Sequence, residues 1–149
     1  MKKTIPILFA IVGFASVGAT RALSDDLEAL AGKWSAPYTN EDGQSLTQQV
    51  EVKKDKFTYK ISDADGGTRL YAEGDLKLEK TGPFKTISFT NIKAGESSSD
   101  TNPVDDTYTS IYTMTDDGAW LVVMNFDKER DNQKPRLDVY RKIKPAAKK

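Results

Sequence analysis

Apolar and polar residues alternate in short segments along most of the chain after Gly32. The clearest segment is FTYKIS, beginning at Phe57, in which every second residue is apolar. A period of two is typical of β-strands that bury one face. Turns of hairpin length, rich in Gly and Asp, join most of the segments, so neighbouring segments are predicted to pair as antiparallel strands. The chain is therefore predicted to be all-β.

Eight such segments can be counted. They begin near Trp34, Leu46, Phe57, Leu70, Thr86, Tyr108, Trp120 and Arg136. Eight sequential strands with short connections predict an up-and-down antiparallel β-barrel, which leaves no exposed sheet edge. A two-sheet sandwich is the competing architecture, but sequential hairpins favour the barrel. A short helical turn over Asp25–Ala31 is predicted just before the first strand.

Two connections and one glycine interrupt the alternation. Residues 63–67 (DADGG) are similar to the start of a calcium loop, but the required sixth-position Gly is Thr68 and the twelfth position is Gly74 instead of Glu. A hairpin turn is predicted there instead. Residues 94–106 (AGESSSDTNPVDD) are polar and without a period, which predicts a mobile loop. Gly74, in mid-strand, predicts a bend or bulge.

The first 22 residues have the three parts of a secretory signal peptide. Met1–Lys3 is basic, Ile5–Val17 is apolar, and Thr20 and Ala22 are small residues flanking Arg21. The apolar run of 13 residues is too short to span a bilayer, which favours cleavage over an uncleaved anchor. The chain has no Cys, so a lipid-modified N-terminus is excluded.

These features predict three parts of the chain: a signal peptide at 1–22, a barrel domain at 23–144 and a disordered basic tail at 145–149. The mature protein is expected to be exported, either to the periplasm or as a secreted protein. It is not expected to remain inserted in a membrane after cleavage. Ala22 is the predicted last residue of the signal, with Ala19 as the second choice.

The chain contains neither Cys nor His. A thiol nucleophile, an imidazole base and the common zinc sites are therefore excluded. Disulfides are also excluded, so packing alone must stabilise the exported domain. Without Lys2, Lys3 and Arg21 the mature chain has 19 basic and 22 acidic residues, a net charge of −3. This balance provides no electrostatic footprint for nucleic acid.

Five segments, in matching order and spacing, resemble a family of exported bacterial lipocalin-like domains that is abundant in planctomycetes. They are Leu30–Trp34 (LAGKW), Asp55–Thr58 (DKFT), Ala72–Leu78 (AEGDLKL), Lys85–Phe89 (KTISF) and Ile111–Trp120 (IYTMTDDGAW). The resemblance covers Leu27–Ile143, nearly all of the mature chain. It implies a small calyx-like barrel of the lipocalin type and no particular activity.

The resemblance also implies a structural floor for the barrel. Gly32 and Trp34 match the opening of the first lipocalin strand, where the Trp closes one end. Lipocalins commonly place an Arg from the last strand over this Trp. Arg141 is the matching position, with Arg136 as the second choice.

The inward faces of the predicted strands supply the candidate ligand-binding residues. They are Phe57, Tyr59, Leu76, Phe89, Tyr112, Met114, Trp120 and Val122. An eight-stranded barrel either holds one small ligand or is filled by its own side chains, and both alternatives remain open at this point. The tyrosines favour a cavity, because a buried phenol needs a partner that a ligand or water can supply.

Two carboxylate pairs and one serine run are the remaining candidates for chemistry. Glu73 and Asp75 share a strand face, and Asp116 and Asp117 share a turn. A glycosidase needs two carboxyls facing each other across a cleft, and nothing in the pattern brings either pair into that arrangement. Residues 96–100 (ESSSD) are typical of a solvated loop. No catalytic residue, metal site or cofactor is predicted.

The function predicted from the sequence is non-catalytic binding of a small, mostly apolar ligand inside an exported barrel. The alternative is an exported protein-interaction or inhibitor module that acts through the barrel rim and residues 94–106. An enzyme that uses Tyr or carboxylate chemistry is a third class.

Export generates the first testable prediction. Expressed with its natural N-terminus in a bacterial host, the protein is expected outside the cytoplasm and shortened. N-terminal sequencing should begin at Leu23, or at Thr20 for the second cleavage site. Recovery of the full-length chain from the cytoplasm would contradict the signal peptide.

Overall fold

The computed structural model describes residues 17–128 and 134–144, with side chains from Leu23 onward. One helix, α1 (Val17–Leu30), precedes the strands. The strands are β1 (Gly32–Thr39), β2 (Ser45–Lys53), β3 (Lys56–Ser62), β4 (Thr68–Thr81), β5 (Phe84–Ser97), β6 (Asp100–Pro103), β7 (Tyr108–Met114), β8 (Ala119–Met124) and β9 (Arg136–Lys142).

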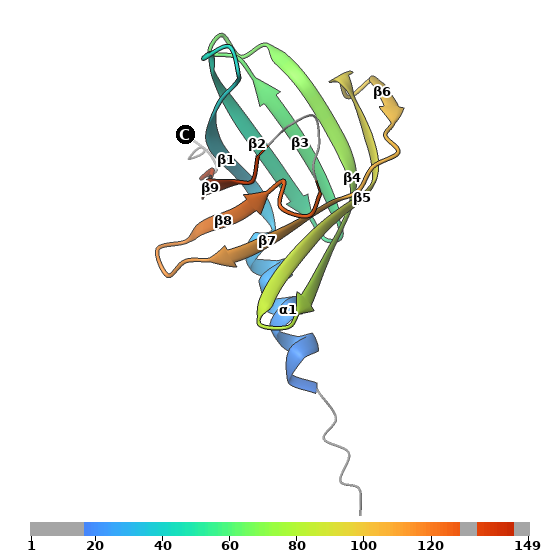
Figure 1. Cartoon of the computed structure of the whole chain (residues 1–149), viewed down its shortest axis with the longest axis vertical. Coiled ribbons are helices and arrows are strands. Elements are labelled where there is room, and N and C mark those ends of the chain that lie inside the picture. The colour runs from blue at the N-terminus through green and yellow to red at the C-terminus, as the bar shows by residue number, and fades with distance from the viewer. Residues whose placement is uncertain (1–16, 129–133, 145–149) are drawn as a thin grey trace, which may run out of the picture.

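Eight of these strands form a closed antiparallel barrel. Their order is β4-β3-β2-β1-β9-β8-β7-β5, and β5 pairs with β4 to close the ring. The prediction of an all-β, eight-stranded up-and-down barrel is confirmed. Figure 1 shows α1 at one end of the barrel, which we call the α1 end. The opposite end, where β1–β2, β3–β4 and β5–β6 are joined, is called the rim.

Helix α1 packs against the α1 end through residues that follow Ala22. Leu30 is fully buried, and Leu27 packs against the core. The carboxylate of Asp26 accepts a hydrogen bond from the Tyr112 hydroxyl at 2.8 Å and forms an ion pair with Lys85 at 2.7 Å. The helix begins eight residues before the predicted helical turn over 25–31, and it runs through the predicted cleavage site.

Trp34 fills the barrel interior at the α1 end. It is 1% exposed, its Nε1 donates to the Leu30 carbonyl at 2.8 Å, and its ring meets Trp120 edge-to-face at 5.7 Å between centroids. Gly32, just before it, has a φ of 118°, a conformation that L side chains rarely adopt. These contacts place Trp34 inside the α1 end of the barrel, the position expected of the floor residue.

The cation over Trp34 is Lys142, so the prediction of Arg141 at this position is wrong. The Lys142 Nζ lies 5.2 Å from the centre of the Trp34 ring. In the β1–β9 register, Lys142 is the partner of Trp34 and Arg141 is the partner of Ser35. A shift of one residue moves a side chain to the other face of the sheet. Arg141 accordingly points outward and pairs with Asp117 at 2.6 Å.

A bulge bends the β4–β5 pair at Gly74. The register shifts between Glu73 and Asp75, and Asn91 opposite has a φ of 50°. A Cβ on Gly74 would lie 2.6 Å from the Thr90 carbonyl oxygen, so the close backbone approach requires glycine there. The bend predicted at Gly74 is confirmed, and the extra residue on β5 turns Ile92 inward, where it is 6% exposed.

The prediction of a mobile loop over residues 94–106 is wrong. The end of β5 and the four-residue β6 form a hairpin, with Lys93 opposite Pro103 and Gly95 opposite Thr101. The segment is polar because most of β6 is exposed, and backbone pairing forms the strands without an apolar pattern. Gly95 is needed because a Cβ there would lie 1.7 Å from the Asp100 carbonyl oxygen.

The turn predicted at residues 63–67 is confirmed. It joins β3 to β4, and the Asp63 side chain accepts a hydrogen bond from the Gly67 N–H at 2.6 Å. Within the described residues, no helix has the length and apolar character needed to cross a membrane. Most of the predicted signal peptide and the predicted tail at 145–149 lie outside the described residues.

The floor arrangement predicts a large stability effect for Trp34→Ala. Removing this buried ring leaves a cavity and should lower the free energy of unfolding by about 3–5 kcal/mol. Urea unfolding followed by circular dichroism measures the change. Phe84→Ala is the matched control, because Phe84 is 55% exposed in the β4–β5 turn and should change stability by about 0.5 kcal/mol or less. Equal effects of the two substitutions would contradict the floor assignment.

Candidate functional site

The barrel contains a cavity of about 300 Å³ in the half that lies toward the rim. The residues that line it come from all eight barrel strands and from the connections beside them. They are Tyr38, Val50, Phe57, Tyr59, Ile61, Leu70, Ala72, Phe89, Ile92, Ala94, Val104, Tyr108, Trp120, Val122, Met124, Asn125, Arg136 and Tyr140. The interior is therefore packed at the α1 end and hollow toward the rim.

Most of the cavity wall is apolar. Phe57 from β3 and Phe89 from β5 meet edge-to-face, with 4.8 Å between ring centroids. Trp120 from β8 lies 5.1 Å from the Tyr140 ring of β9. Aliphatic side chains and alanines complete this wall. Such a surface binds apolar groups through exclusion of water and close packing.

A polar cluster occupies one side of the cavity. The Tyr59 hydroxyl donates to Gln48 Oε1 at 2.9 Å. Arg136 Nε and Nη2 donate to the Asp138 carboxylate at 3.0 and 3.2 Å. The Arg136 guanidinium also lies 4.9 Å from the centre of the Tyr38 ring. Because β1 and β9 pair by their backbones at Trp34 and Ser35, this cation–π contact joins the same two strands nearer the rim.

Burial keeps the phenols of Tyr59 and Tyr140 neutral. It is the largest cause of the raised pKa of Tyr59, and it also raises the pKa of Tyr140 well above its ordinary value. Arg136 lowers both pKa values, but by less than burial raises them. Both side chains therefore keep their hydroxyl protons at physiological pH and act as neutral hydrogen-bonding groups.

Two buried polar nitrogens beside the cavity have no hydrogen-bond partner among the described residues. They are Nε2 of Gln48 and Nε1 of Trp120. Gln48 is fully buried and Trp120 is 1% exposed. An unsatisfied buried donor costs about 1–3 kcal/mol, so the interior around the cavity is not optimised for stability alone.

Five of the eight predicted ligand-binding residues line the cavity: Phe57, Tyr59, Phe89, Trp120 and Val122. Leu76, Tyr112 and Met114 do not. Leu76 and Tyr112 are buried and Met114 packs against the buried core. The Tyr112 hydroxyl is engaged by Asp26 of α1, so it is not free for a ligand. Strand alternation predicts which side chains point inward, but it does not predict their height along the barrel.

The sequence analysis missed several residues of the cavity. Ile92 and Ala94 were missed because the bulge at Asn91 shifts the inward face of β5 by one residue. Arg136 was considered only as a floor residue, although it lies beside Tyr38 and not Trp34. Alternation misleads on β9, because the apolar Leu137 and Val139 are 56% and 39% exposed while Arg136 shares the inward face with Tyr140.

The carboxylate pairs are used in local structure. Glu73 accepts a hydrogen bond from the Tyr71 hydroxyl at 3.0 Å, and Asp75 is bonded to Lys56 and Asn91. Hydrogen bonds from Thr115 and Arg141 lower the pKa of Asp117 to about 2. These carboxylates do not line the cavity. Among the described residues no group of three Asp, Glu, His or Cys side chains is placed to hold a metal ion.

Comparisons with protein-family models, with curated proteins and with solved structures find no match for this chain. The proposed function therefore rests on the cavity and the residues that line it.

The position of Tyr112 yields a prediction that separates structure from binding. Tyr112→Phe removes its hydrogen bond to Asp26 and should lower the free energy of unfolding by about 1 kcal/mol. It should leave the affinity for a ligand in the cavity unchanged, because Tyr112 does not line the cavity. Urea unfolding and a ligand titration of the same preparation measure both. Weaker ligand binding at unchanged stability would show that this assignment is wrong.

Proposed function

We propose that this protein is an exported, lipocalin-like carrier or receptor that binds a small, mostly apolar molecule inside its barrel without chemical conversion. The observation that carries the proposal is the cavity of about 300 Å³ between aromatic and aliphatic side chains. A barrel stabilised only by its own packing has no need of this space, since voids in a protein core reduce stability.

The cavity size supports a compact ligand. Ligand sites in proteins begin at about 300 Å³, and a cavity of about 150 Å³ lined by apolar residues accepts benzene. The volume here corresponds to a molecule of about two or three rings or a comparable branched chain. A long extended lipid would need more length than the packed α1 end leaves available, because Trp34 and Leu30 fill that end.

The wall chemistry supports binding through hydrophobic contact and a small number of hydrogen bonds. The edge-to-face pair Phe57–Phe89 and the Trp120 ring offer aromatic surface. Tyr59 and Arg136 add polar groups on one side, which fixes the orientation of a ligand. No step that makes or breaks a covalent bond is part of the proposal.

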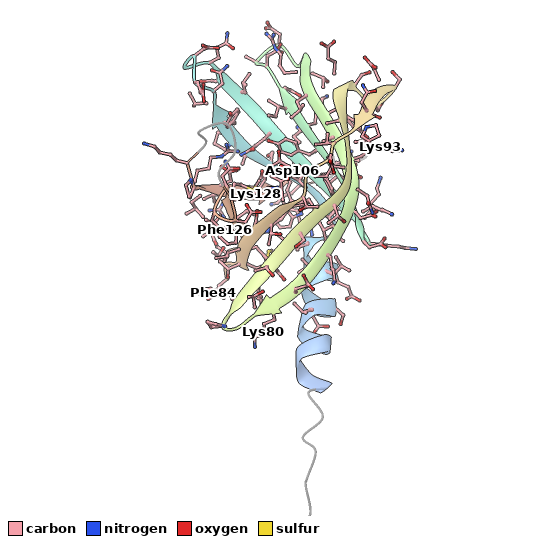
Figure 2. All side chains as sticks on the ribbon, turned by 45° about the vertical axis from the view of Figure 1, so that its right-hand side comes forward. Lys80, Phe84, Lys93, Asp106, Phe126 and Lys128 are labelled. Carbon is pink, nitrogen blue, oxygen red and sulfur yellow. The ribbon has the colours of Figure 1, made fainter. Side chains whose placement is uncertain are left out.

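The alternative of a protein-interaction or inhibitor module receives less support. It relied on a flexible segment at residues 94–106, which instead forms a paired hairpin. Figure 2 shows two of the exposed apolar residues in separate places: Phe84 in the β4–β5 turn and Phe126 after β8. Isolated apolar side chains of this kind are normal on protein surfaces. Leu137 and Val139 are also exposed, and they pair with Val123 and Leu121 on the outer face of β8 and β9, so this strip is the surface feature that supports a protein partner.

Filling the cavity provides the direct test. The probe is N-phenyl-1-naphthylamine, an uncharged aromatic compound whose fluorescence increases in apolar surroundings. Ala94→Phe places a ring in the cavity wall and should weaken probe binding at least tenfold, because it occupies ligand space. Lys93→Phe is the matched control: Lys93 is the exposed neighbour on the same strand and lies outside the barrel in Figure 2.

The control should bind the probe within twofold of the unchanged protein, and circular dichroism should show the same fold for all three. Absence of probe binding by the unchanged protein would remove the proposal. Equal weakening by both substitutions would show that the probe binds elsewhere.

A further inference from the structure

Building on the proposed ligand-binding function, we propose that the cavity selects an uncharged molecule that carries a hydrogen-bond acceptor, and rejects an anion of the same shape. The proposal rests on two observations in different parts of the molecule. One is the guanidinium of Arg136 in the cavity wall, whose charge is balanced by Asp138. The other is the negative charge of the connections around the rim.

Arg136 is the one charged side chain among the described residues that line the cavity. Alone, it would mark a site for a carboxylate or phosphate ligand. Its Nε and Nη2 atoms, however, already donate to Asp138, with N–O distances of 3.0 to 3.3 Å. Arg136 and Asp138 are two residues apart on β9, so both side chains face the barrel interior. The positive charge is therefore balanced inside the protein.

An anionic ligand bound at the Arg136 guanidinium would lie close to the Asp138 carboxylate, which is hydrogen-bonded to the same guanidinium. Asp138 is 7% exposed, so little water is present to screen the repulsion. The ligand would also lose the hydration of its own charge without gaining a full counter-charge. An uncharged ligand avoids both costs.

Hydrogen bonds to an uncharged ligand remain available. The Arg136 side chain is 33% exposed, and its Nη1 atom takes no part in the pair with Asp138. A guanidinium has five N–H donors, so a carbonyl or ether oxygen near the rim can accept one of those left by Asp138. The neutral hydroxyl of Tyr59 lies in the same wall, but its proton is donated to Gln48 Oε1, so the donors come from Arg136. The wall therefore offers donors without an unbalanced charge.

The rim adds a second barrier to anions. Among the described residues, the rim connections, the adjoining ends of β5 and β6 and the β6–β7 connection carry these carboxylates: Glu41, Asp42, Asp63, Asp65, Glu96, Asp100, Asp105 and Asp106. Two of them are balanced by ion pairs, Asp63 with Arg69 and Asp106 with Lys128. Figure 2 shows Asp106 and Lys128 close together on this side of the barrel. The remaining negative charge lowers the local concentration of anions around the rim.

A pair of nearly isosteric probes tests the proposal. 2-Acetylnaphthalene is uncharged and carries a carbonyl acceptor, and 2-naphthoate has the same ring system with a carboxylate. Both have two rings, in keeping with the cavity volume. Isothermal titration calorimetry of the full mature chain at pH 7.5 measures the two dissociation constants. We expect the ketone to bind at least tenfold more tightly than the anion.

A third probe tests the opposite charge. Protonated 2-(aminomethyl)naphthalene should also bind more weakly than the ketone, because the Arg136 guanidinium lines the cavity whereas Asp138 does not. Tighter binding of this cation than of the ketone would overturn the selection for uncharged ligands, as would equal or tighter binding of 2-naphthoate.

Asp138→Asn tests the cause of the selectivity. The variant keeps the side-chain shape and leaves the Arg136 charge unbalanced, so 2-naphthoate should gain at least fivefold relative to the ketone. Asp117→Asn is the matched control, since Asp117 forms a similar Arg pair on the outer surface at the α1 end and loses the same charge. The control should leave the ratio unchanged.

An unchanged ratio in Asp138→Asn would overturn the proposed role of the Arg136–Asp138 pair. The comparison of probes on the unchanged protein decides the selectivity even if this variant does not fold. Binding of N-phenyl-1-naphthylamine to the same preparation tests the binding function separately from the selectivity. If that probe binds and the anion is preferred, the selectivity is wrong and the binding function stands. If none of the probes binds, the binding function is wrong.

Discussion

Closure of the sheet between β4 and β5 is the constraint on which the rest of this structure depends. Once β5 pairs with β4, every strand has one face turned to a shared interior and no barrel strand is left without a neighbour. The bulge at Gly74 makes this pairing possible by bending both strands, and only glycine leaves room for the Thr90 carbonyl. Closure also sets how much space the inward side chains must fill.

The interior side chains fill that space unevenly. At the α1 end, Leu30 and Trp34 form a dry floor, and Asp26 holds the helix to β7 through Tyr112. Toward the rim the inward side chains, which include the small Ala72 and Ala94, do not fill the barrel and leave a cavity. The barrel interior thus has a packed half at the α1 end and a hollow half toward the rim, which is lined by aromatic and aliphatic side chains.

Electrostatics distinguishes this cavity from a simple apolar void. The Arg136–Asp138 pair places a positive charge in the cavity wall and a negative charge next to it, and the Arg136–Tyr38 contact joins the first and last strands. Breaking such a partly buried pair leaves an uncompensated charge, which is far more costly than the pair itself. The polar cluster therefore joins the first and last strands beside the cavity, and the proposed selection for uncharged ligands rests on its charge balance.

The alternating pattern and the short connections determined the fold class and the sequential order of strands, and the alternation determined the inward direction of Phe57, Tyr59, Phe89, Trp120 and Val122. These follow from local geometry, because successive side chains of a strand point to opposite faces. The tertiary structure decided the rest. The height of each residue along the barrel depends on strand tilt and stagger, so Tyr112 fell in the packed half and Ile92 in the hollow one. Whether Lys142 or Arg141 lies over Trp34 depends on the pairing register of β1 and β9. These strands are more than a hundred residues apart in the sequence, so a local sequence pattern does not determine their register.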